Sequence, residues 1–150
     1  MVYPTVVAKI FILLPLSWHR SPGYGISLVA ETTTGCILSS ESAATHSEAS
    51  ELQLPEDLGT QAAMSLLQEI KLGGVVNSTH QGLLFILCAL CLEDVSKVRV
   101  GKLSSYSIKT LQHIKEFLGV QFSIKPNPVT GTVLLTCIGS GFQNLYRKVS

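Results

Sequence analysis

The chain has 150 residues, of which 46% are hydrophobic and 14% are charged, and its formal net charge is +1. This length and composition fit one globular domain with a buried core, and they exclude a disordered or collagen-like chain. The small net charge hides two unequal parts. Residues 1–94 hold three basic and nine acidic side chains (−6), whereas residues 95–150 hold eight basic and one acidic (+7). This division favours a polyanionic partner for the basic part, with RNA the first candidate and an acidic neighbouring domain the alternative.

The first twenty residues, MVYPTVVAKIFILLPLSWHR, form an atypical apolar segment. Its apolar stretch at 6–18 is interrupted by Lys9 and Pro15 and is too short to span a bilayer. It weakly resembles the apolar region of a signal peptide, but no clean cleavage site follows. We therefore expect a core strand, or the abnormal start of a truncated chain, and no membrane partner.

Residues 25–39, GISLVAETTTGCILS, predict two strands joined by a turn near Thr34 and Gly35. The next segment, residues 41–53, is small, polar and acidic, which is typical of an exposed loop.

Residues 54–74, LPEDLGTQAAMSLLQEIKLGG, predict a helix. Pro55 suits the first helical position, and Gly73 is placed to end the helix. Apolar residues at helical spacing indicate its buried side, and these are Leu58, Ala62, Leu66 and Ile70.

A second helix is expected to begin near Ser78, where Ser78 and Gln81 have the spacing of a capping box. Residues 83–92 are apolar on every side, which predicts a helix buried all round. Cys88 and Cys91 form a CxxC motif, which in other contexts indicates zinc or redox chemistry. Here the motif lies inside an unbroken apolar run with no second cysteine or histidine pair nearby, so we predict core packing and no metal.

Residues 96–100, SKVRV, alternate as a strand does. A further helix is expected in KLSSYSIKTLQHIKEF, residues 102–117, with Gly119 as its end. Its predicted inner side consists of Ile108, Leu111, Ile114 and Leu118. A hairpin around residues 127–131 and a basic tail follow. The order of elements predicts an α/β or α+β fold, a two-layer sandwich with the helices on one face of a mixed sheet.

The basic residues of the second half are the strongest candidates for a binding site. Lys97, Arg99 and Lys102 lie on a strand and its exit, with Lys109 and Lys115 on the following helix and Lys125 on the next strand. Such a set can follow a phosphate backbone without reading bases. The sequence contains neither a complete glycine-rich nucleotide motif nor a Ser–His–Asp set that sequence order alone would assemble.

Five segments in order resemble the RNA 3'-terminal phosphate cyclase family, and more closely its cyclase-like branch. They are SPGYGISLVAETTTGCILSSE, LPEDLG, LLQEIKLGGVVNSTHQGLL, EDVSKVRVGKLSSYSIKTL and LLTCIGSGFQNL. The resemblance covers residues 21–150 and implies the last repeat unit or units of the cyclase fold. It also implies a domain division into residues 1–20 and 21–150, the latter being the C-terminal part of a cyclase-like domain, with the inserted domain of the family absent.

The same resemblance implies that the cyclase chemistry is lost. Cyclases attack ATP with a histidine at the start of a helix, and that position falls on Tyr106, which has no imidazole nucleophile. The Asp-Gln pair of cyclases falls on Gly82 and Leu83, and the aspartate of their GGxVD segment falls on Asn77. We therefore expect no catalytic residue and no cofactor.

The resemblance implies a non-catalytic nucleolar factor in small-subunit (18S) pre-rRNA processing. Such a factor would bind pre-rRNA in the small-subunit processome and an assembly GTPase. The alternatives are a pre-rRNA endonuclease or a truncated product without its own function. An Arg-Asp-x-Lys run proposed for nuclease activity falls on Gln112, His113 and Lys115, and only the lysine is kept.

Overall fold

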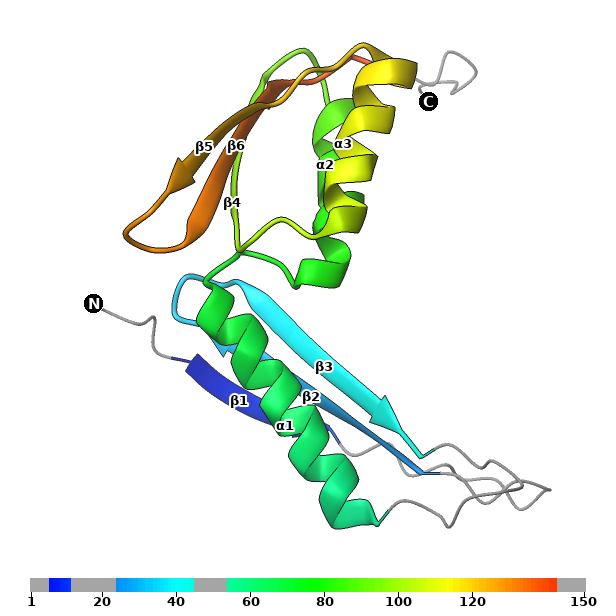
Figure 1. The fold of residues 1–150 in the computed structure, drawn as a ribbon, viewed down its shortest axis with the longest axis vertical. Coiled ribbons are helices and arrows are strands. Elements are labelled where there is room, and N and C mark those ends of the chain that lie inside the picture. Colours follow the sequence, from blue (N-terminus) through cyan, green and yellow to red (C-terminus); the bar gives the residue numbers. More distant parts are fainter. Residues whose placement is uncertain (1–5, 12–23, 45–53, 143–150) are drawn as a thin grey trace, which may run out of the picture. The chain divides into compact units, whose positions relative to one another are not determined.

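A computed structural model describes residues 6–11, 24–44 and 54–142, and the chain divides into two compact units, Met1–Lys71 and Leu72–Ser150. The first unit contains β1 (Val6–Phe11), β2 (Gly25–Thr32), β3 (Ile37–Ala43) and α1 (Pro55–Leu72), whose last residue begins the second unit (Figure 1). The second contains a short 3-10 helix (Ser78–His80), α2 (Gln81–Leu90), β4 (Val95–Val100), α3 (Ser105–Leu118), β5 (Ser123–Asn127) and β6 (Thr132–Ile138). The predicted order of elements is confirmed from β2 onward, and the α+β class is confirmed.

The prediction of one mixed sheet is wrong. The described strands form two separate sheets of three, in the orders β1-β2-β3 and β4-β6-β5, and every pairing is antiparallel. Strand pairing joins residues far apart in the sequence, so local patterns indicate where strands lie but not which sheet they enter.

In the first unit, α1 packs along the sheet (Figure 1). The predicted stripe is confirmed, because Leu58, Ala62 and Leu66 are buried and Ile70 packs against the core. The sheet contributes the other buried members of this core, Leu28, Ala30 and Leu38. The turn between β2 and β3 also lies where it was predicted, with Gly35 at φ 81°, a left-handed conformation that glycine adopts without strain.

Two expectations about the first unit need correction. The expected loop at 41–53 begins later, because Glu41–Ala43 still belong to β3, and residues 45–53 lie outside the described part. Residues 6–11 form β1, as the expected strand, but β1 pairs with β2 along its whole length. The expected division between residues 1–20 and 21–150 therefore falls inside one sheet, because β1 lies before residue 21 and β2 after it.

In the second unit, α2 and α3 lie together on one side of the sheet β4-β6-β5 (Figure 1). The core joins both layers and consists of Phe85, Cys88, Ala89, Val100, Ile114, Val120, Leu135 and Cys137. The ring of Phe122 packs beside that of Phe85, with centroids 5.7 Å apart.

The helix ends of this unit agree with the sequence for α3 but not for α2. Gly119 ends α3 in the left-handed conformation, at φ 69°. The helical segment begins at Ser78, as predicted, but as a 3-10 turn, and α2 itself begins only at Gln81, whose side chain bonds to Lys102 and Ser107. Ile108, expected on the inner side of α3, is 46% exposed.

Helix α2 is not buried on every side, contrary to the prediction. Phe85 and Ala89 are fully buried, but Leu83 and Leu87 are 57% and 54% exposed. The face of α2 that carries Leu83 and Leu87 is therefore apolar and more than half exposed, and it contains no charged residue.

Candidate nucleic-acid interface

The first turn of α3 is built by a serine cap. The Oγ of Ser104 accepts a hydrogen bond from the backbone amide of Ser107 (3.1 Å) and lies 2.8 Å from the Ser107 Oγ. This capping satisfies an amide that a helix start would otherwise leave without a partner. It places Tyr106 in the first turn with its side chain 65% exposed.

Tyr106 packs against α2 at Gly82. A Cβ added to Gly82 would lie 2.8 Å from the Cε1 of Tyr106 and 3.1 Å from the Oγ1 of Thr110. The tyrosine ring therefore occupies the space that any side chain at position 82 would need. These are the positions where the resemblance aligns the cyclase nucleophile and the aspartate of the Asp-Gln pair, so the two departures from the cyclase pattern meet in one contact.

Gln81 joins the start of α2 to the start of α3. Its side chain is 1% exposed, its Nε2 donates to the carbonyl oxygen of Lys102 (3.2 Å), and its Oε1 accepts from the Ser107 Oγ (2.8 Å). From the sequence, Gln81 was assigned to a helix cap. Its partners in the structure are 21 and 26 residues further along the chain, and such distant contacts leave no local sequence signal.

The candidate basic residues are all exposed but do not share one surface. Lys97 and Arg99 alternate with the inward-facing Val98 and Val100 on β4, so they lie on the sheet face away from the helices. Lys109 and Lys115 belong to α3, in the layer that covers the opposite face, and Lys102 lies in the connection from β4 to α3.

A groove runs between α2 and α3. Its lining is mostly apolar and consists of Ile86, Leu90, Tyr106, Lys109, Thr110, His113, Ile114, Phe117 and Leu118. The Nδ1 of His113 lies 3.9 Å from a carboxylate oxygen of Glu116, and both side chains are exposed to solvent. Of the three positions aligned with the proposed nuclease run, only His113 lines the groove.

Two of the four cysteines, Cys88 and Cys137, are buried packing residues. Cys91 is exposed, so the prediction of core packing for the CxxC motif is confirmed for Cys88 and wrong for Cys91. Burial raises the pKa of the Cys88 thiol, helped by Cys91 and opposed by a hydrogen bond with Ser96. Burial likewise raises the pKa of Cys137, with smaller contributions from Cys88 and Cys91. A raised pKa keeps a thiol protonated and unreactive.

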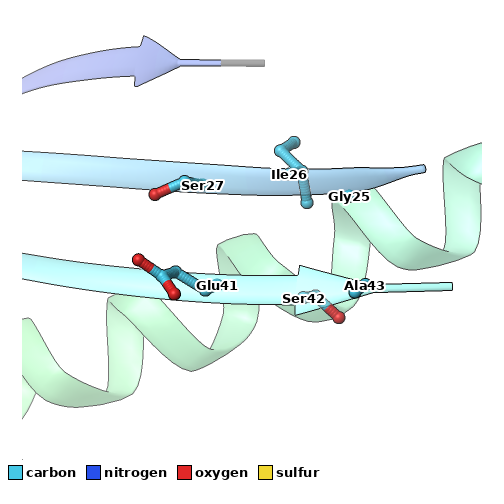
Figure 2. A pocket seen from close by; sticks show the side chains of 6 residues that line it. All are labelled: Gly25, Ile26, Ser27, Glu41, Ser42 and Ala43. Atoms are coloured by element: carbon cyan, nitrogen blue, oxygen red, sulfur yellow. The ribbon is translucent and has the colours of Figure 1, made fainter. Parts of the chain in front are cut away.

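In the first unit, a shallow pocket lies at the ends of β2 and β3 (Figure 2). Ser27 and Glu41 are partners in the ladder and lie side by side on the adjacent strands, and Ser42 also lines the pocket. Its lining contains hydroxyls and one carboxylate but neither histidine nor cysteine, so it supplies no nucleophile with a base beside it.

Within the described ranges, no group of three or more potential metal-ligating side chains comes together. None of the helices seen in this part of the chain is both long and apolar enough to cross a membrane.

Comparison with known proteins supports the resemblance read from the sequence. The chain is similar to a probable RNA 3'-terminal phosphate cyclase-like protein of Arabidopsis thaliana, with 59% identity over 141 residues, 87% of this chain and 38% of the relative. An RNA 3'-terminal phosphate cyclase-like protein of Homo sapiens is 47% identical over 136 residues, 87% of this chain and 36% of the relative. A Schizosaccharomyces pombe protein named rRNA processing protein rcl1 is 35% identical over 132 residues, 87% of this chain and 35% of the relative.

Residues 14–71 match the family described as RNA 3'-terminal phosphate cyclase (RTC), insert domain. The expectation that the inserted domain is absent is therefore wrong, and the match ends where the first compact unit ends. The chain spans little more than a third of the length of these relatives. Over that part, it belongs to the cyclase-like branch of the RNA 3'-terminal phosphate cyclase family.

Proposed function

We propose that this chain acts in ribosomal RNA processing as a non-catalytic, RNA-binding factor. The name of the S. pombe relative supports the process, and the basic second unit supports an RNA partner. In finer detail, we propose a role in 18S pre-rRNA processing within the small-subunit processome of the nucleolus, with an assembly GTPase as protein partner.

The contact between Tyr106 and Gly82 is the observation that carries the non-catalytic part of the proposal. Adenylyl transfer needs a nucleophile at the first turn of α3, and a phenol packed against the neighbouring helix does not replace an imidazole there. The groove beside it is mostly apolar and offers one lysine and one histidine.

Incubation with ATP labelled in its α-phosphate tests this proposal, with a true cyclase as the positive control. We expect no covalent adduct on the chain by intact-mass measurement or by autoradiography. An adduct at any residue would contradict the non-catalytic assignment.

The process itself is tested by affinity purification of the tagged chain from nucleolar extract. We expect enrichment of small-subunit precursor RNA and of a GTPase over a tag-only control. A recovery equal to that of the control would remove the assignment to ribosome assembly.

The endonuclease alternative has weaker support. Of the three positions aligned with the proposed nuclease run, only Lys115 keeps its residue type, and it lies outside the groove lining. Cleavage of a pre-rRNA fragment by the chain, abolished in Lys115→Ala, would be required to revive it.

A further inference from the structure

The outer face of the sheet β4-β6-β5 carries a concentrated positive charge. The helices α2 and α3 cover only the other face (Figure 1). Because side chains alternate along a strand, the neighbours of the core residues Val98 and Leu135 on β4 and β6 point outward, and the strand register extends this face to β5. The outward positions in the middle of the sheet are Lys97, Arg99, Ser123, Lys125, Leu134 and Thr136, and we call these six the outer sheet face. The outward positions at its ends are Val95, Asn127, Thr132 and Ile138.

The strand register arranges these residues in two rows. Arg99 and Lys125 both pair with Leu134, one from each side, and Lys97 and Ser123 both pair with Thr136. Adjacent strands lie about 4.8 Å apart, so the Cα atoms of Arg99 and Lys125 are about 10 Å apart. Lys97 and Arg99 are about 7 Å apart along one strand.

The chemistry of this face fits phosphates and not bases. Lys97, Arg99 and Lys125 are exposed, and no member of the outer sheet face is acidic. The hydroxyls of Ser123 and Thr136 add donors for phosphate oxygens. None of the six residues is aromatic, so the face has no platform on which a base would stack.

The lysines of α3 are placed differently. Lys109 lines the apolar groove, and Lys115 is followed by Glu116. Lys109 and Lys115 are six residues apart on α3, so they do not share one face of the helix, whereas Arg99 and Lys125 pair with the same residue of β6.

We infer that the outer sheet face binds the phosphodiester backbone of RNA through Lys97, Arg99 and Lys125, without reading base sequence. This inference rests on the proposed function, since it names the surface that meets the RNA. It adds Lys125 to the interface and leaves Lys109 and Lys115 outside it.

The test compares two triple variants that lose the same charge. The sheet variant carries Lys97→Gln, Arg99→Gln and Lys125→Gln, and the matched control carries Lys102→Gln, Lys109→Gln and Lys115→Gln. Affinity for oligouridylate and for oligoadenylate is measured by fluorescence anisotropy across a salt series. All six side chains are exposed, and circular dichroism confirms that the variants are folded.

We expect the sheet variant to lose at least about ten-fold in affinity at low salt, for both oligonucleotides. The slope of log affinity against log salt should become shallower by about 2, because each phosphate contact on a single strand contributes about 0.7. The control variant should keep most of the slope. Equal losses in both variants would mean a diffuse charge effect and would overturn the inference.

Lysine footprinting supplies a second measurement on the unmodified chain. An amine-reactive reagent is applied with and without oligouridylate, and modification is read by mass spectrometry. We expect protection of Lys97 and Lys125 and none of Lys109 and Lys115. Protection confined to the α3 lysines would overturn the assignment of the surface.

The outcomes also separate this inference from the proposed function. An unmodified chain that binds no RNA would contradict both. If the unmodified chain and the sheet variant bind RNA equally well, only the assignment of RNA binding to the outer sheet face is contradicted. Polyglutamate is tested as a competitor at the same charge as RNA. If it competes as well as RNA does, the partner of this face is an acidic protein surface, and the assignment to RNA is overturned.

Discussion

At the residue scale, the informative contact is between Tyr106 and Gly82. The sequence located both positions through the family resemblance, 24 residues apart. It could not reveal that they touch, because the contact depends on the crossing of α2 and α3. Gln81, one residue earlier, joins the starts of the two helices through hydrogen bonds to Lys102 and Ser107.

A double-mutant cycle tests the contact. Gly82→Ala gains helix propensity of up to about 1 kcal/mol but forces its Cβ to 2.8 Å from the Tyr106 ring. In a Tyr106→Ala background the clash with the ring is removed and only the close contact with Thr110 stays, so Gly82→Ala should be more favourable there by about 0.5–2 kcal/mol. Urea unfolding of the four proteins measures the difference, and additive effects would show that the ring and the glycine are independent.

The matched control for this cycle is Gly59→Ala in α1. Nothing lies within 4 Å of a Cβ added to Gly59. The substitution should therefore stabilise the chain by about 0.5–1 kcal/mol, in either background at position 106.

The buried thiols predict a dependence of stability on pH. In the unfolded chain a thiol titrates near its ordinary pKa of about 8.5, whereas burial raises the pKa of Cys88 and Cys137 in the folded chain. Above that pH the folded state holds more protons than the unfolded state, so stability is complete below about pH 8.5 and falls as the pH rises through the folded pKa.

Melting curves between about pH 7 and pH 10 check this expectation. The Cys88→Ala, Cys137→Ala variant should melt lower at neutral pH because two small cavities form, but its melting temperature should fall less steeply with pH. Cys36→Ala, at a half-buried position of the first unit, should keep the original slope. Parallel curves for all three proteins would contradict the assignment of the pH effect to Cys88 and Cys137.

At the element scale, α2 shows how far an apolar pattern can be read. The helix was predicted as buried all round, since residues 83–92 are apolar on every side. The structure covers only the face with Phe85 and Ala89. Composition reveals that a surface is apolar, but what lies against that surface depends on tertiary packing. The buried side of α1 was predicted correctly, because a helix with one apolar stripe has only one side that can face the core.

The exposed face of α2 is expected to promote self-association of the isolated chain. Leu83→Gln and Leu87→Gln together should reduce light scattering at high concentration, with less than about 1 kcal/mol lost in stability because both side chains are more than half exposed. Phe85→Gln is the control, because it disrupts a fully buried position and should unfold the second unit. Unchanged scattering in the double variant would show that this face does not drive association.

At the scale of the whole molecule, the two compact units differ in charge, although the change of sign at residue 95 lies inside the second unit, which begins at Leu72. The sequence gives the first unit three basic and seven acidic side chains and the second unit eight basic and three acidic. Composition thus predicted two unequal parts, although a single domain was expected from the length. The number of sheets could not be predicted, because the hydrophobic pattern of each strand fits either sheet and only long-range pairing decides.

Because the two units have separate cores, we expect a core substitution to destabilise only the unit that contains it. The two buried clusters share no residue, with Leu135 central to one and Leu38 belonging to the other. Leu135→Ala should cost about 2–5 kcal/mol and accelerate amide exchange in β4 and β6, while the amides of β2 and β3 keep their rates. Leu38→Ala is the matched leucine on a strand of the first sheet and should give the reverse pattern. Hydrogen exchange followed by mass spectrometry distinguishes these results, and acceleration throughout the chain in either variant would mean that the two units unfold as one.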